Sequence, residues 1–279
     1  MPEFQLFRIK VYENNQLHLF EDLTRPQILL TLLEQGPAAE LRRGITWHVG
    51  KIHRLDDTAI YFRLGKTTRS TVEVFREGDF VETEFESAPY THIFLDRELG
   101  VTAIARKTRL APRPQGIARQ LERLLNETPW LKERGHRIEI GALKDPEEFI
   151  QYLRSAYSVR RFSVTFTPPN PLDIDDDITR PFQEWLSSTK AIKGKAEIDG
   201  PELDAEKLAS VARSAAATGN EASARLSLEK EARPVTKHLS GGPVTIGQDE
   251  LGAEEEKVTF LARIRAVFRR VAGKDGDET

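Results

Sequence analysis

Hydrophobic and polar residues alternate along much of the first hundred positions, and this two-residue period predicts a series of β-strands. Residues 4–12 alternate in this way and include one strongly apolar face with Phe7, Ile9 and Val11. Further strands are predicted at residues 45–52, 60–64, 72–75, 81–86, 91–95 and 101–105. A short helix is predicted after Thr24, because Gln27 stands at the spacing of a capping box.

After Pro112 the pattern changes, and helical periods alternate with strand periods. Helices are predicted at residues 115–125, 178–188, 204–216 and 254–272, with another beginning at Asp145-Pro146. Strands are predicted at residues 137–142, 158–167, 191–198, 222–229 and 244–246.

This order of elements predicts an α+β fold. A mixed or antiparallel sheet is favoured over a parallel doubly wound sheet, because the strands begin as hairpins and glycine-rich strand-to-helix turns are missing. We expect a β-rich module over residues 1–88 and an α+β module over residues 89–250. Residues 251–279 would form a linker, an amphipathic helix and an acidic disordered tail.

Composition excludes several classes of chemistry. The 279 residues contain no cysteine, which excludes disulfides, cysteine-ligated zinc and a thiol nucleophile. The longest apolar run, near residues 28–33, is too short to span a membrane. The start of the chain lacks the features of a signal peptide. We therefore expect a cytoplasmic protein without a membrane span.

The net charge of −3 conceals a basic segment. Residues 97–137 contain ten Lys or Arg residues and four acids. Such a segment suits the phosphate backbone of DNA or RNA. The candidate nucleic-acid-binding residues are Arg106, Lys107, Arg109, Arg113, Arg119, Arg123, Arg160 and Arg161. The alternative is a solvated surface whose charges pair with acids elsewhere, such as Glu82, Glu84 and Glu86.

The predicted helix at residues 254–272 is a second candidate site for binding. Its apolar stripe consists of Leu261, Ile264, Val267, Phe268 and Val271. This stripe could bind a partner protein, lie on an anionic membrane, mediate self-association or dock on the body of the same chain.

Other motifs give weaker indications of chemistry, and we expect no metal or other cofactor. Gly65-Lys66-Thr67 lacks the earlier glycine and the following helix of a P-loop, so a hairpin turn with an exposed Lys66 is favoured. The acids at 173–177 resemble a cation loop without its glycine, and they are interpreted as charges favouring the next helix. Asp96 and Lys107 suggest a metal-dependent nuclease, but Ala105 stands where that site needs an acid.

Three histidines, His48, His53 and His92, are a further candidate for a general base or a metal group. Their sequence spacing does not match a known metal-binding motif, so ordinary surface histidines are favoured.

Several short segments carry a resemblance to a known group of proteins: Arg113-Pro-Gln-Gly-Ile117, Arg137-Ile-Glu-Ile140, Ser158–Phe166 and Pro169-Asn-Pro171. Through them, residues 91–246 resemble uncharacterised bacterial proteins that are often encoded near phage-defence genes. The resemblance implies a setting in antiviral defence and supplies no catalytic residues. The combined expectation is an accessory or sensor protein that binds nucleic acid and a protein partner. A metal-dependent nuclease and a protein-only structural adaptor are the alternatives.

Overall fold

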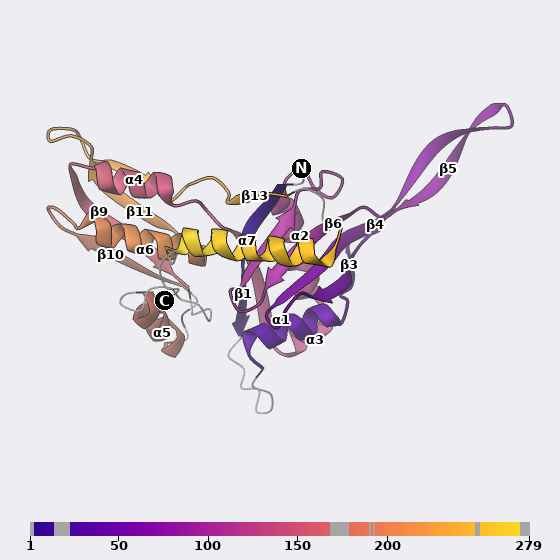
Figure 1. The fold of residues 1–279 in the computed structure, drawn as a ribbon, viewed down its shortest axis with the longest axis horizontal. Helices are drawn as coiled ribbons and strands as arrows, with labels where there is room; N and C mark the ends of the chain where they lie inside the picture. Colours follow the sequence, from indigo (N-terminus) through magenta and orange to yellow (C-terminus); the bar gives the residue numbers. More distant parts are fainter. Residues whose placement is uncertain are drawn as a thin grey trace.

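Two antiparallel sheets lie at opposite ends of the molecule in the computed structural model, and helix α7 (Glu254–Ala272) lies between them (Figure 1). The structure describes residues 3–13, 23–167, 179–189, 191, 193–248 and 252–273. The fold is α+β, as predicted, and every pair of strands found in these residues is antiparallel.

The larger sheet has nine strands among the described residues, in the order β13-β1-β7-β6-β4-β3-β2. β5 pairs with β4, and β8 pairs with β1 beside β13. The strands of this sheet are β1 (Glu3–Glu13), β2 (Ala38–Arg42), β3 (Ile45–Arg54), β4 (Ala59–Arg76), β5 (Asp79–Ser87), β6 (Tyr90–Asp96), β7 (Val101–Ala105), β8 (His136–Ala142) and β13 (Thr245–Gly247).

The smaller sheet has four described strands in the order β10-β9-β11-β12. They are β9 (Ser158–Phe166), β10 (Gly194–Asp199), β11 (Ala222–Ser227) and β12 (Val235–His238). Helices α4 (Glu147–Ser155) and α6 (Ala205–Thr218) pack together and share a hydrophobic cluster with β9 and β11. Helix α5 (Thr179–Ser188) contacts β9, where the rings of Phe182 and Phe166 lie 4.6 Å apart.

β1 is buried on both faces because a hydrophobic cluster packs against each side of the larger sheet at this strand. Phe7 and Ile9 face a cluster with three helices, α1 (Arg25–Glu34), α2 (Pro114–Glu127) and α3 (Pro129–Glu133). Phe4 faces a second cluster, which includes α7 and the core of the smaller sheet. The sequence prediction of a single strongly apolar face was therefore incomplete. Arg8, on the same face as Phe4, is only 1% exposed and lies 5.6 Å from the centre of the Phe268 ring.

α7 is held on the larger sheet by aromatic packing and by charge. The Phe260 ring lies 4.6 Å from Phe4 and 5.1 Å from Phe94, between ring centres. Arg265 reaches Asp96 at 2.7 Å and Asp56 at 2.8 Å. Burial opposes ionisation of Asp56, but hydrogen bonds from Arg265 and from nearby backbone N–H groups outweigh it and lower the pKa of this carboxyl to about 2.

β4 differs most from the prediction. Its 18 residues join the strands that were expected at 60–64 and 72–75. Gly65-Lys66-Thr67 therefore lies inside a strand, and Lys66 is half-buried with its Nζ 3.3 Å from the carbonyl oxygen of Leu110. The hairpin turn predicted for these three residues is wrong, because β3, β6 and β5 together supply pairing along the whole strand.

The predicted boundary between residues 88 and 89 falls inside the larger sheet, since β6, β7 and β8 join the same sheet as β1–β5. α7 begins and ends as predicted, but it belongs to the hydrophobic core rather than to a separate appendage. β2 and β12 were missed by the sequence analysis. None of the helices in the described ranges is long and apolar enough to cross a membrane.

We predict that Arg265→Gln lowers the free energy of unfolding by about 3 kcal/mol, because it leaves the carboxylate of Asp96 without its cation. Asp96 is only 2% exposed, so water cannot replace the guanidinium fully. Urea denaturation would measure the loss. The control is Arg270→Gln on the exposed side of the same helix, which should change stability by less than about 0.5 kcal/mol. Equal losses in both variants would contradict the assignment.

Candidate nucleic-acid interface

The predicted basic residues do not form one continuous stripe. Six of them surround the connection from β7 to α2 and the exposed side of α2: Arg106, Lys107, Arg109, Arg113, Arg119 and Arg123. Arg160 and Arg161 lie on β9, in the other sheet. The structure therefore separates these two arginines from the first six, a division that charge counting along the sequence could not reveal.

Several of these cations already have partners within the protein. Arg106 forms an ion pair with Glu3 at 3.7 Å, and Arg123 donates to the carbonyl oxygen of Leu41 at 3.0 Å. Arg161 pairs with Asp199 at 2.6 Å. The acids proposed as alternative partners lie on β5, where Glu84 approaches Arg69 at 4.0 Å.

A different basic surface lies on the larger sheet, on the face opposite α1, α2 and α3. Alternation along β4 explains its position: Phe62 and Leu64 pack under the helices, so Arg63 points to the other face. We call this region the His92 surface and define it by Lys51, Arg63, Tyr90, His92 and Lys107. It adjoins an open hollow of about 340 Å³, lined by His48, Gly50, Lys51, Arg63, Gly65, Lys66, Thr67, Ala88 and Tyr90.

Hydrogen bonds and ring contacts fix the centre of the His92 surface. The hydroxyl group of Tyr61 lies 2.7 Å from His92 Nδ1 and accepts a hydrogen bond from Arg63 Nε at 3.4 Å. The Arg63 guanidinium stacks 4.3 Å from the centre of the Tyr90 ring, and Tyr90 remains 41% exposed. A planar cation and an aromatic ring are thus presented together to solvent.

Four cations from different elements converge on His92. Burial contributes most to lowering the pKa of His92 to about 4, followed by the positive charges of Arg63, Lys107, Lys257 and Lys51. Arg63 comes from β4, Lys51 from β3, Lys107 from the segment after β7, and Lys257 from α7. Within the described part of the chain, none of the four forms an ion pair with a carboxylate. Lys51 and Lys107 are exposed and Arg63 is half-buried, whereas Lys257 is only 9% exposed, so three of the four cations are open to a ligand.

Sequence reasoning found Lys107 but missed Lys51, Arg63 and Tyr90. Lys51 stands at a register shift between Gly50 and His53 in β3, with a left-handed φ of 49°. Irregular pairing of this kind redirects side chains, and neither the irregularity nor the contact across β3, β4 and β6 has a signal in the sequence. The sequence did contain one indication of the His92 surface, which is the exposed Tyr-x-His pattern at the start of β6.

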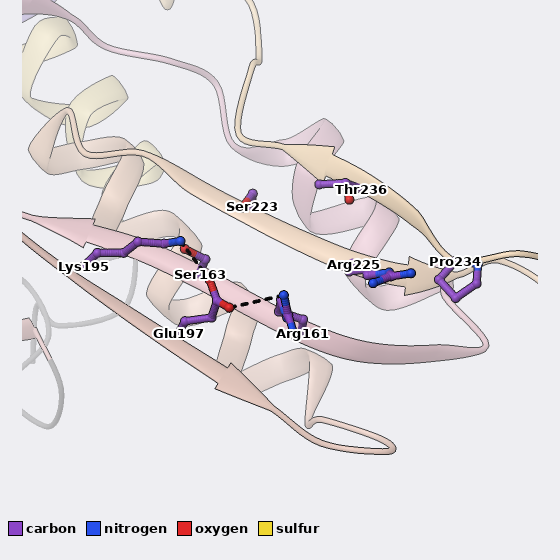
Figure 2. Close-up of a pocket in the computed structure, with 8 residues that line it drawn as sticks. All are labelled: Arg161, Ser163, Lys195, Glu197, Ser223, Arg225, Pro234 and Thr236. Carbon is purple, nitrogen blue, oxygen red and sulfur yellow. Dashed lines mark hydrogen bonds and ion pairs between the residues drawn. The ribbon is translucent and has the colours of Figure 1, made fainter.

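The open face of the smaller sheet is polar but largely neutralised (Figure 2). Glu197 lies between two cations, 2.8 Å from Lys195 and 3.3 Å from Arg161. Ser163, Ser223, Arg225, Pro234 and Thr236 complete this hollow of about 340 Å³. Its internal ion pairs make this face a weaker attractor for phosphate than the His92 surface.

The apolar stripe of α7 is used inside the protein. Leu261 and Ile264 are each 1% exposed, Phe268 is 3% exposed and Val271 is 4% exposed, while Val267 is half-buried. The proposal that these five residues bind a partner or mediate self-association is corrected by this packing. Helical periodicity identified the stripe but could not show that the chain itself covers it.

The nuclease alternative finds no support in the described residues. Asp96 pairs with Arg265 and also accepts a hydrogen bond from the N–H of Leu99 at 2.9 Å. No group of three or more His, Cys, Asp or Glu side chains in the described ranges is arranged to hold a metal ion. His48 instead contacts the Thr67 hydroxyl group at 3.0 Å. The acids at 173–177 lie outside the described residues.

No protein-family model matches the sequence, and no curated protein is significantly similar to it. The description of the protein thus comes from its own structure. It is an α+β protein with a basic, aromatic surface on one face of the larger sheet, which has nine strands among the described residues.

We predict that His92 titrates with a midpoint near pH 4 and that Lys107→Gln raises this pKa, because one of the surrounding positive charges is removed. NMR titration of the His92 ring would measure both values. Lys230→Gln, an exposed position between β11 and β12, serves as the control and should leave the midpoint unchanged. The unfolded chain binds this proton at higher pH, so acidification from about pH 6.5 to about pH 4 should favour unfolding.

Proposed function

We propose that this protein binds single-stranded nucleic acid through the His92 surface. The observation that carries the proposal is the gathering of Lys51, Arg63 and Lys107 around His92, none of them paired with a carboxylate within the described residues, beside the exposed Tyr90. Each phosphate that such cations neutralise releases counterions and so contributes affinity.

A single strand fits this surface better than a duplex. Tyr90 carries Arg63 over its ring and is 41% exposed, so a base that has left its stack can pack against this pair. The hollow next to Tyr90 offers room for an unpaired base, and the Thr67 hydroxyl lies in its lining. Stacking of this type accepts every base, which predicts weak sequence preference.

The proposed role is that of an accessory or sensor protein without chemistry of its own. The resemblance to proteins encoded near phage-defence genes suggests that the bound strand would arise during infection, and a cytoplasmic location belongs to the same proposal. Arg109 and Arg113, on the connection from β7 to α2, are exposed and could extend the contact along the backbone beyond Lys107.

We predict that the protein binds a fluorescent single-stranded oligonucleotide with an affinity that falls steeply as salt rises. The double variant Lys51→Glu/Lys107→Glu should weaken binding at least about tenfold and reduce the slope of log affinity against log salt by about 1.4, for two lost phosphate contacts. Fluorescence anisotropy across a salt series measures both quantities. The control is Arg119→Glu/Arg123→Glu, which makes the same change in charge on the exposed side of α2.

The outcomes separate the candidate surfaces and functions. A larger loss in the α2 control would move the site to the basic residues first identified in the sequence. Absence of salt-sensitive binding to RNA and DNA would overturn the proposal and favour a protein-only adaptor. Cleavage of the oligonucleotide in magnesium or manganese would instead favour the nuclease.

We also predict that binding strengthens as pH falls from 7 towards 5. A bound phosphate favours the protonated imidazole of His92, so its pKa rises from about 4 in the complex and protons are taken up on binding. Anisotropy titrations at several pH values would show this linkage. In His92→Gln the pH dependence over this range should be smaller, whereas an unchanged dependence would place the phosphate away from His92.

A further inference from the structure

The open face of the smaller sheet, on the side away from α4 and α6, carries a hollow whose floor is lined by hydroxyl groups (Figure 2). The strand register places Ser163 of β9 directly opposite Ser223 of β11, and Arg225 lies two residues further along β11 on the same face. Arg225 is in turn opposite Thr236 of β12. These four residues form a compact group across three strands, which we call the Arg225 site.

The hydroxyl groups of the Arg225 site are available to a ligand. Ser163 is only 8% exposed, and it lines the hollow. A hydroxyl group buried to this extent normally has a hydrogen-bond partner. Among the described residues the Ser163 hydroxyl has none, and the same holds for the hydroxyl groups of Ser223 and Thr236. Three donors from three strands therefore face the hollow.

The charges of this face are distributed unevenly. On the β10 side, Glu197 lies 2.8 Å from Lys195 and 3.3 Å from Arg161. Asp199 lies 2.6 Å from Arg161, so two acids and two bases neutralise each other there. On the β11 side, Arg225 is exposed and forms no ion pair within the described part of the chain. The positive charge that remains on this face is therefore at the Arg225 site.

The pairing of β11 with β9 shifts in register immediately after Arg225. Arg225 pairs with Arg161, but the next residue of β11 pairs with Val159. Arg160 is therefore an extra residue in β9, and both Arg160 and Arg161 are exposed. Irregularities of this kind re-aim side chains and are over-represented next to functional sites.

We propose that the Arg225 site binds the phosphate group of a small phosphomonoester. A guanidinium group and hydroxyl groups on three strands donate from several directions, which suits the tetrahedral oxygens of a phosphate better than a planar carboxylate. The hollow has a volume of about 340 Å³, at the small end of ligand pockets, so it fits a metabolite rather than a polymer. Glu197, opposite Ser163 on β10, can accept hydrogen bonds from hydroxyl or amino groups elsewhere in the ligand.

The Arg225 site is independent of the His92 surface, which lies on the other sheet. A nucleic acid gains affinity from each cation along its backbone, so it favours the surface with more unpaired cations. The Arg225 site offers one unpaired cation and recognises its ligand through hydrogen bonds. Either proposal can therefore fail without the other.

We predict that glycerol 3-phosphate, added to the full chain, shifts the backbone amide NMR signals of Ser163, Ser223 and Arg225. Arg225→Gln should weaken this binding at least about tenfold, because the charged donor is lost. Ser163→Ala should weaken it about fivefold. This variant should leave the urea midpoint unchanged, since the Ser163 hydroxyl has no partner among the described residues.

The matched control is Lys237→Gln, which removes one positive charge from the opposite face of the same sheet, where Lys237 lies 3.9 Å from the centre of the Tyr152 ring. It should bind glycerol 3-phosphate as the parent protein does. Succinate, which carries its charge on planar carboxylates, should bind at least about tenfold more weakly than glycerol 3-phosphate.

Four results would overturn the proposal. They are no binding of glycerol 3-phosphate, signal shifts confined to the His92 surface, equal weakening in Arg225→Gln and Lys237→Gln, and equal affinity for succinate and glycerol 3-phosphate. The last result would show that the site attracts any small anion and does not recognise a phosphate.

Discussion

The packing of Phe260 against Phe4 and Phe94 joins the two ends of this molecule. Through these rings α7 closes one face of the larger sheet, and the same hydrophobic cluster continues through α6 into β9 and β11 of the smaller sheet. Aromatic contacts of this size bury large apolar areas. The ion pairs of Arg265 with Asp56 and Asp96 then fix the position of the helix along the sheet.

The His92 surface depends on this closure. α7 covers the part of the sheet face around Phe4 and brings Lys257 to 5.2 Å from the centre of the Tyr61 ring. Tyr61 in turn contacts His92, while Arg63 lies two residues further along β4 and beyond the apolar cluster. β4 thus begins in buried apolar surroundings and continues through the exposed basic His92 surface. Its second half, which pairs with β5, lies in acidic surroundings. The sign of the surface charge changes along a single continuous strand.

Interactions between residues close in the sequence made many elements of this structure predictable. Helix α7 was expected at residues 254–272, and the Asp204 carboxylate caps α6 by accepting from the N–H groups of Glu206 and Lys207. Gly219, with a left-handed φ of 69°, ends that helix within three residues of its predicted end at residue 216. Such features depend on residues within one turn of each other.

Long-range contacts account for what the sequence could not show. The apolar stripe of α7 was visible, but it did not include Phe260, whose partner Phe4 lies about 250 residues earlier in the chain. The buried Arg8 could not be anticipated, because polar residues normally indicate an exposed strand face. Charge density along the chain identified the basic segment at residues 97–137, which contains only Lys107 of the His92 surface; the structure assembles that surface from β3, β4, β6 and the segment after β7.

The position of α7 late in the chain also has a consequence for synthesis. β1 is made first, yet the aromatic side chain that covers Phe4 belongs to a helix that follows every described strand. During translation the larger sheet therefore presents an uncovered apolar face until residues beyond 260 have left the ribosome. A chain of this topology completes this part of its core only after every described strand of the larger sheet has been made.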